Sequence, residues 1–328
     1  MICDSSKINM GRKLILKRVD IEGQRIAVFR MGALGDTLLF FPLLRVLGNW
    51  NPLCLDWIVD GRWKSLLTRF SGFQRILSAE DVGWWKLYGE LEDGAVSFPL
   101  PRYDHALLFA RDPEGRLARN MEKVTGARTW TVDPLPGEEG IGHVVDVYLN
   151  LLEGTGMQAS EFDARFVPTD PDLFFVRKEL GFGNDLPLCW SIHPGSGSPG
   201  KNMGVDIFAR LADMIEERGH RLLVILGPAE MDRAEEIQNR FGGEQTVFAL
   251  NWPLERLAAA MTFCRGYIGN DSGITHLAGL LRLPGIAFFK STSPEMWGPL
   301  GKTIRCLNSD STQEAPGILA DLLSESGR

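Results

Sequence analysis

The sequence predicts an α/β protein made of two doubly wound parallel-sheet domains. Apolar runs of strand length alternate with helical patterns along most of the chain, which is typical of parallel sheets covered by helices. Residues 166–171 read FVPTDP, and two prolines in a polar stretch indicate a linker, after which the alternation restarts. The length of 328 residues is enough for two ordinary domains. We expect these domains to cover residues 1–167 and 168–328.

The first half begins with a buried strand at residues 25–30, RIAVFR. A helix is expected at 36–47, although Pro42 falls in its second turn, where proline cannot donate a backbone hydrogen bond. The other elements expected in this half are strands at 53–59 and 106–109 and a helix at 144–152.

The second half repeats the same alternation. Strands are expected at 188–192, 222–226, 267–268 and 286–289, and helices at 205–218 and 231–240. Ligands of doubly wound sheets bind beyond the carboxyl ends of the strands. Because two such domains leave a cleft between them, we expect the ligand site in that cleft.

The composition excludes several classes of protein. Hydrophobic residues make up 44% and charged residues 23%, and the net charge is −7. This acidic balance argues against nucleic acid as the main partner, because binding to its backbone needs a concentrated basic surface. Residues 1–22 contain no signal-peptide core, and no apolar run approaches the about 18–20 residues that span a bilayer. We expect a cytoplasmic protein, a location that still allows contact with a membrane surface.

The cysteines indicate reduced thiols and no structural zinc. They lie far apart in the sequence, with no CxxC or Cys/His cluster among them. An odd number of widely spaced cysteines is typical of a cytoplasmic protein. The residues are Cys3, Cys54, Cys189, Cys264 and Cys306.

The most informative stretch is residues 269–276, GNDSGITH, between a short strand pattern and an apolar helical run. Asp271 and Ser272 are good helix N-cap residues, and glycines let a backbone approach a ligand closely. The start of a helix offers unpaired N–H groups and the positive end of the helix dipole. The stretch is therefore either an anion site or an ordinary capped turn. His276 has two interpretations as well, a ligand contact or a packed or capping histidine.

A second group of small residues follows the first strand, in RMGALGDT at residues 30–37. Its spacing is not GxGxxG, and no acidic residue is a clear ribose ligand at the end of the next strand, so a dinucleotide fingerprint is not supported. Asp36 would lie at the carboxyl end of the sheet, where a carboxylate can accept a proton. The alternative is that Asp36 only caps the helix.

A third group is the loop HPGSGSPGKN at residues 193–202, after the first strand of the second half. It lacks the GxxxxGK[ST] spacing of a Walker loop. Its small residues leave room for a ligand, and Lys201 supplies a point charge for a phosphate. The alternative is a connector with an incidental surface lysine.

Taken together in order, these motifs resemble glycosyltransferase family 9, which contains the ADP-heptose–lipopolysaccharide heptosyltransferases. The resemblance covers most of the chain, and the combination is more specific than any single motif. It rests on residues 30–42, 193–202 and 267–279, and continues in 143–153, 283–289 and 297–299.

The resemblance implies the GT-B fold, in which two Rossmann-like domains face each other across a cleft, the first binding the acceptor and the second the nucleotide-sugar. It implies a general base at Asp36 and a phosphate contact at Lys201, which would also stabilise the leaving diphosphate. The donor-binding residues that it implies are His193, Ser196, Lys201, Glu230, Asp271, Ser272, Gly273 and His276. For Glu230, a position matching a nucleoside contact, the alternative is a helix cap.

The implied reaction is an inverting transfer of heptose from ADP-heptose to the inner core of lipopolysaccharide at the cytoplasmic face of the inner membrane. No cofactor and no metal are implied, since Lys201 and helix N–H groups would stabilise the diphosphate. The alternatives are another nucleotide-sugar or acceptor, and a catalytically silent paralogue that binds nucleotide-sugar. Two departures concern Lys290, which follows Phe289 where the family usually has glycine, and residues 109–113, which lack the family's Asp-x-x-Gly pattern on the acceptor side. Lys290 would either contact a phosphate or face solvent.

Overall fold

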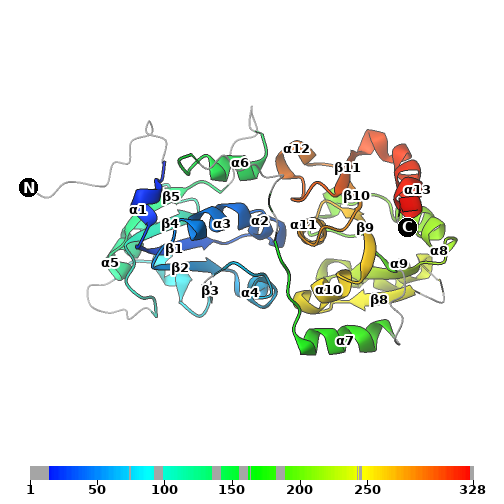
Figure 1. Ribbon diagram of the computed structural model, residues 1–328, viewed down its shortest axis with the longest axis horizontal. Helices are drawn as coiled ribbons and strands as arrows, with labels where there is room; N and C mark the ends of the chain where they lie inside the picture. Colours follow the sequence, from blue (N-terminus) through cyan, green and yellow to red (C-terminus); the bar gives the residue numbers. More distant parts are fainter. Residues whose placement is uncertain are drawn as a thin grey trace, which may run out of the picture. The chain divides into compact units, whose positions relative to one another are not determined.

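A computed structural model describes residues 15–73, 75–91, 99–134, 142–154, 162, 164–181, 189–241, 243 and 246–325. By their contacts these residues belong to two compact units, each built on one parallel sheet (Figure 1). Unit 1 comprises Met1–Gly32, Phe40–Thr68 and Gly72–Gln158, and unit 2 comprises Ala33–Leu39, Arg69–Ser71 and Ala159–Arg328. The boundary predicted between residues 167 and 168 stays a prediction.

The sheet of unit 1 has five strands in the order β3-β2-β1-β4-β5. The strands are β1 (Arg25–Arg30), β2 (Cys54–Val59), β3 (Arg75–Ser78), β4 (His105–Phe109) and β5 (Arg128–Val132). All four pairings are parallel, and the strand order reverses at β1, as in a doubly wound sheet. The predicted strands at 25–30, 53–59 and 106–109 are confirmed. The sequence patterns miss the edge strands β3 and β5, which are short and begin with arginine.

Helices cover both faces of this sheet. They are α1 (Arg18–Ile21), α3 (Phe41–Asn49), α4 (Gly61–Leu67), η1 (Trp84–Tyr88), α5 (Arg116–Thr125) and α6 (Val144–Leu149). Ala106 and Leu108 of β4 share a buried core with α5 and η1. Phe109 contacts Tyr148 of α6 on the opposite face, with ring centroids 5.5 Å apart. Successive side chains of β4 therefore pack against different helix layers.

The single helix predicted at 36–47 is wrong. The chain forms α2 (Leu34–Leu38) and α3 as separate helices, and Pro42 is the second residue of α3. Proline is tolerated in a first helical turn, where its missing N–H has no partner within the helix, but it would break a continuous helix here. Because the two helices are separate, α2 belongs by its contacts to unit 2, where it packs against α11 (Gly273–Leu280).

The sheet of unit 2 has six strands in the order β11-β10-β9-β6-β7-β8. The strands are β6 (Cys189–His193), β7 (Arg221–Leu226), β8 (Thr246–Leu250), β9 (Cys264–Asn270), β10 (Gly285–Phe289) and β11 (Ile304–Asn308). All pairings are again parallel, and the order reverses between β6 and β9. Leu188, the first residue of the strand predicted at 188–192, lies outside the described residues.

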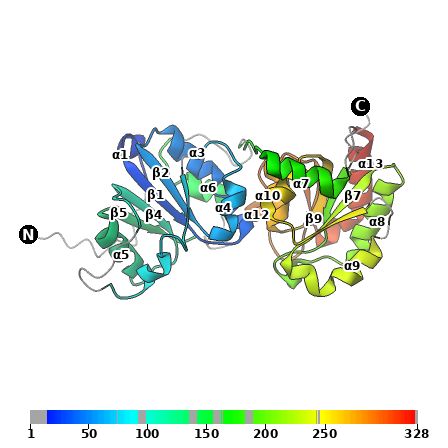
Figure 2. The same cartoon turned by 90° about the horizontal axis from the view of Figure 1, so that it is seen from below.

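Helices line both sides of this second sheet. Besides α11 they are α7 (Asp170–Leu180), η3 (Pro199–Lys201), α8 (Val205–Glu216), η4 (Pro228–Arg233), α9 (Ala234–Arg240), α10 (Leu254–Met261), α12 (Pro294–Trp297), η5 (Ser309–Glu314) and α13 (Ala315–Glu325). Apolar side chains of α8, α9 and α13 form one core with the sheet, and α10 lies on its other side (Figures 1 and 2). Two doubly wound parallel-sheet domains are thus confirmed.

Two smaller expectations need correction. The proline-containing linker ends earlier than expected, because Thr169 caps α7 and Pro171 lies in its first turn. The helix predicted at 231–240 is η4 followed by α9. Within the described residues, we find no helix that is both long and apolar enough to cross a membrane.

Candidate functional site

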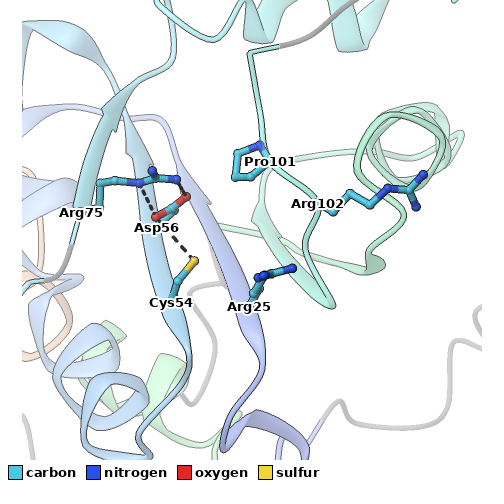
Figure 3. A pocket seen from close by; sticks show the side chains of 6 residues that line it. All are labelled: Arg25, Cys54, Asp56, Arg75, Pro101 and Arg102. Atoms are coloured by element: carbon cyan, nitrogen blue, oxygen red, sulfur yellow. Dashed lines mark hydrogen bonds and ion pairs between the residues drawn. The ribbon is translucent and has the colours of Figure 1, made fainter.

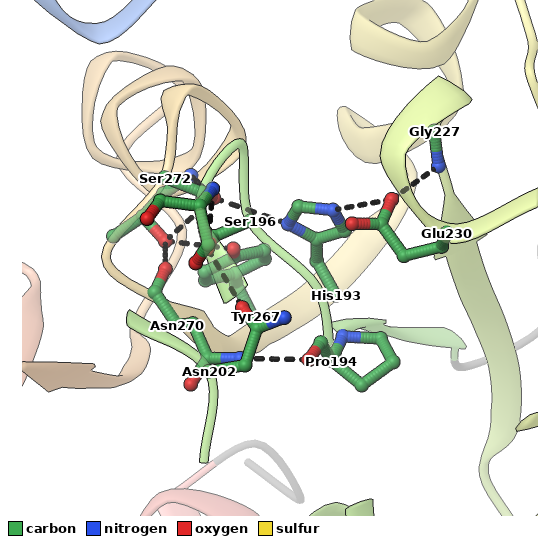
Figure 4. Close-up of polar contacts among 11 residues, drawn as sticks. His193, Pro194, Ser196, Asn202, Gly227, Glu230, Tyr267, Asn270 and Ser272 are labelled. Carbon is green, nitrogen blue, oxygen red and sulfur yellow. Dashed lines mark hydrogen bonds and ion pairs between the residues drawn. The ribbon is translucent and has the colours of Figure 1, made fainter. Parts of the chain in front are cut away.

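The topology of unit 2 brings two of the predicted motifs together. Strands β6 and β9 are neighbours, with His193 paired in register with Gly269. They lie where the strand order reverses, the place at which open α/β sheets bind ligands. The loop at 193–202 and the turn at 269–276 therefore leave the sheet side by side (Figure 4).

The turn after β9 is a capped helix start. Ser272 has an extended backbone and is the N-cap of α11, and its Oγ accepts a hydrogen bond from the Thr275 N–H at 3.4 Å. This confirms the predicted N-cap. The first N–H groups of a helix have no partners within the helix, and they lie at its positive end; here the Ser272 side chain pairs with one of them, the Thr275 N–H. The start of α11 has the geometry for an anion, and anion binding itself stays a prediction.

Lys201 forms an ion pair with the buried Asp271. Its Nζ lies 2.7 Å from Asp271 Oδ2, and the two side chains are 33% and 4% exposed. Thr292, which the sequence patterns miss, donates a second hydrogen bond to the same carboxylate oxygen. Lys201 is therefore held beside the start of α11 by a buried partner, which an incidental surface lysine would lack.

His193 links the two sides of the site. Its Nδ1 lies 3.1 Å from Ser272 Oγ, and its Nε2 lies 3.7 Å from Glu230 Oε2 (Figure 4). Glu230 also accepts a hydrogen bond from the Gly227 N–H at 2.8 Å, so the capping interpretation is correct for one of its oxygens. All three side chains are buried, and their contacts fix the Glu230 carboxylate next to the loop after β6.

Asn270 holds both ends of the loop and is a residue that the sequence patterns miss. Its Oδ1 accepts a hydrogen bond from the Met203 N–H at 3.1 Å, and its Nδ2 donates to the Pro194 carbonyl at 2.7 Å. Within the loop, Ser196 Oγ donates to Asn202 Oδ1 at 2.7 Å. The one signal for Asn270 in the sequence is its position at the carboxyl end of β9. In this structure, the Ser196 side chain therefore stabilises the loop through its hydrogen bond to Asn202.

Lys290 lies at the edge of the same loop. It follows β10, it is exposed, and its Nζ donates to the Asn202 carbonyl at 3.2 Å. The residue that departs from the family pattern thus contacts the loop that carries Lys201. A phosphate contact by Lys290 stays a prediction.

Packing explains the small residues around α11. A Cβ on Gly273 would lie 2.7 Å from Leu34 Cβ, and a Cβ on Gly269 would lie 2.0 Å from the Tyr267 hydroxyl. The side chains of Leu34 and Tyr267 therefore fill the space beside these glycines, where the sequence predicts room for a ligand. His276 is 5% exposed and packs against Gly35 of α2, which fits the packed interpretation. A ligand contact by Gly273 or His276 stays a prediction.

Asp36 is the third residue of α2, and Ala33 is the N-cap of that helix. The interpretation of Asp36 as an N-cap is therefore wrong. Asp36 is half-buried. The role of Asp36 as a base stays a prediction.

The described part of the chain contains no group of three or more His, Cys, Asp or Glu side chains that could hold a metal ion. The buried carboxylates at this site have other partners: Asp271 pairs with Lys201, and Glu230 lies between His193 and the Gly227 N–H. The cationic side chain that pairs with a carboxylate at this site is that of Lys201.

The chain is similar to characterised and solved proteins. Residues 185–319 match the profile of "Glycosyltransferase family 9 (heptosyltransferase)". Lipopolysaccharide heptosyltransferase 2 of Escherichia coli is 24% identical over 86% of this chain and 87% of its own length. The protein of the same name from Salmonella typhimurium is 25% identical over 46% of this chain, and the match spans 42% of that protein.

Solved structures share the fold at low sequence identity. A family 9 glycosyltransferase from Veillonella parvula has a TM-score of 0.75 at 17% identity, over 93% of this chain and 99% of that one. The E. coli ADP-heptose lipopolysaccharide heptosyltransferase II has a TM-score of 0.70 at 15% identity, over 93% of this chain and 100% of that one.

Proposed function

We propose that this chain is a member of glycosyltransferase family 9, as its similarity to that family and to a lipopolysaccharide heptosyltransferase supports, and that it transfers a sugar from a nucleotide-diphosphate donor to lipopolysaccharide. The donor that we propose is ADP-heptose, and the acceptor is the inner core. The observation that carries this proposal is the Lys201–Asp271 pair, held next to the capped start of α11 where the strand order reverses. A lysine and free helix N–H groups at one point suit a diphosphate.

The transfer is a single displacement with inversion at the anomeric carbon. An acceptor hydroxyl attacks that carbon, its proton passes to the Asp36 carboxylate, and the bond to the diphosphate oxygen breaks. Positive charge develops on the sugar and negative charge on the leaving diphosphate. The ammonium of Lys201 and the N–H groups at the start of α11 stabilise the departing charge. Because this acceptor belongs to a membrane lipid, the reaction would take place at a membrane surface.

The proposed donor can be tested without knowing the acceptor. Calorimetry with ADP, UDP and GDP reports the base preference of the site, and we expect ADP to bind most tightly. Incubating the enzyme with a panel of nucleotide-sugars and heptose-deficient lipopolysaccharide, followed by mass spectrometry, reports the transferred sugar. Addition of a single heptose supports the proposal. Transfer of a hexose would assign another donor, and binding of ADP without any transfer would indicate a silent paralogue.

The reaction is expected to proceed fully in EDTA. Lys201 and the start of α11 supply the positive charge that a divalent ion provides in other transferases. Initial rates measured with EDTA, and again after adding Mg²⁺ or Mn²⁺, should agree. Activity that disappears with EDTA and returns with a metal ion would contradict metal independence.

Replacing Gly195 by alanine is expected to weaken ADP binding. A Cβ on Gly195 would lie 2.0 Å from Glu230 Oε1, so the carboxylate must move away from the loop. If Glu230 holds the nucleoside, the loss of one hydrogen bond to a charged group, about 1.5–3 kcal/mol, raises Kd by about 10- to 150-fold. Gly197→Ala is the matched control, because its Cβ meets no atom within 4 Å. Equal ADP affinity in both variants would remove Glu230 from the donor site.

A further inference from the structure

Unit 1 contains a cavity of about 450 Å³ at the amino-terminal edge of its sheet (Figure 3). Parallel strands all begin at this edge, so residues that are distant in the sequence meet there. The lining residues come from the first parts of β1, β2 and β3 and from the segment before β4: Arg25, Cys54, Asp56, Arg75, Pro101 and Arg102. Asp36 follows the carboxyl end of β1, whereas this cavity lies at the amino-terminal ends of the strands. The cavity is therefore not at the edge of the sheet that the proposed reaction uses.

On one wall of the cavity, the charges of Asp56 and Arg75 offset each other, and hydrogen bonds hold the two side chains in place. Asp56 is 1% exposed, and its carboxylate accepts hydrogen bonds from Arg75 Nε at 2.8 Å and from the Tyr103 hydroxyl. The hydrogen bond to Asp56 raises the pKa of Arg75. Burial, together with the same carboxylate, raises the pKa of Tyr103, so the phenol remains a donor. The Asp56 carboxylate is therefore already paired with Arg75 and Tyr103, and it does not offset the charges of Arg25 and Arg102.

The remaining lining residues carry an excess of positive charge. Within the described parts of the chain, neither the Arg25 nor the Arg102 side chain forms an ion pair. Asp104 accepts a hydrogen bond at 2.7 Å from the backbone N–H of Arg25. Burial and the nearby Asp56 raise the pKa of Cys54, so its thiol adds no negative charge. Arg102 extends towards Gly126 at the end of α5, but a helix end supplies only about half a charge.

We propose that this cavity is a second binding site, which takes a sugar-sized molecule carrying a phosphate or carboxylate group. Guanidinium groups bind both oxyanions through paired hydrogen bonds. A volume of about 450 Å³ lies in the range of small-molecule pockets and exceeds what a lone inorganic ion needs. Arg75, fixed by Asp56, orients the oxyanion, and Arg25 supplies uncompensated charge. Arg102 also lines the cavity, with its guanidinium directed towards the end of α5 (Figure 3). Pro101 and Cys54 give the sugar ring an apolar wall.

Calorimetry at constant ionic strength tests the site with glucose 6-phosphate, glucuronate and glucose as probes. We expect saturable binding of at least one of the two anions, no binding of glucose, and the same result when the protein is saturated with ADP. In the double variant Arg25→Gln/Arg102→Gln the anion affinity should fall at least tenfold, with ADP affinity unchanged. The control Arg116→Gln/Arg119→Gln removes two charges from exposed positions of α5 in the same unit and should bind like the wild type.

Several outcomes would overturn the proposal. They are no saturable binding of either anion to the wild type, equal binding of glucose, displacement of the anion by ADP, and an anion affinity that survives in the Arg25/Arg102 variant. An equal loss in the Arg116/Arg119 control would also count against it, because the effect would then reflect net charge. Failure of this site would leave the proposed transfer reaction intact, since ADP binding and sugar transfer are measured separately.

Discussion

Replacing Asp36 by asparagine is expected to lower kcat by about 10²–10⁴-fold, the usual contribution of a positioned general base. Asparagine has nearly the same shape as aspartate, so α2 should keep its packing against α11, but the amide cannot take the proton of the acceptor hydroxyl. Because Asp36 is not among the residues proposed to hold the donor, the Kd for ADP should change little. Single-turnover rates with saturating donor, together with ADP calorimetry, measure the two effects separately.

The matched control for this substitution is Asp213→Asn, which makes the same chemical change at an exposed position on α8. It should leave both kcat and ADP affinity unchanged. An Asp36→Asn protein that turns over like the wild type would exclude Asp36 as the base. A variant with lower kcat, weaker ADP binding and lost helical circular dichroism would point to a structural role in α2 instead.

Local signals explain why much of this fold could be predicted from sequence. The strands β1, β6 and β7 are buried and mostly apolar, and Ser272 precedes its helix as the N-cap preferences require. The meeting of the 193–202 loop with the 269–276 turn follows from a general rule of doubly wound sheets. These features depend on short stretches of chain and on topology, both of which sequence patterns report.

The features that could not be predicted depend on contacts between distant residues. Leu34 fills the space beside Gly273, so that glycine is explained by packing against α2, whereas its sequence context suggests room for a ligand. Asn270 holds the ends of a loop from another strand, and Thr292 reaches Asp271 from beyond β10. No spacing rule identifies such partners before the sheet order is known.

Because Lys201 is paired with Asp271, replacing Lys201 by alanine should have two effects at the site. Lys201→Ala would take away one donor to the leaving diphosphate and leave the Asp271 carboxylate, 4% exposed, with less compensation and close to the incoming phosphates. Loss of one such stabilising contact typically costs about 10²–10³-fold in rate. We therefore expect kcat/KM to fall by at least about 10²-fold, with kcat affected because the charge on the diphosphate grows as the bond breaks.

Three companion variants make this prediction specific to the pair. Lys178→Ala changes an exposed lysine on α7 and should behave like the wild type. Adding Asp271→Asn to Lys201→Ala removes the uncompensated carboxylate, so ADP affinity should recover partly while kcat stays low. Lys201→Arg keeps the charge with a different shape and should retain an intermediate rate. If Lys201→Ala binds ADP and turns over like the wild type, the ion pair only holds the loop to β9, and the phosphates must be bound by other residues.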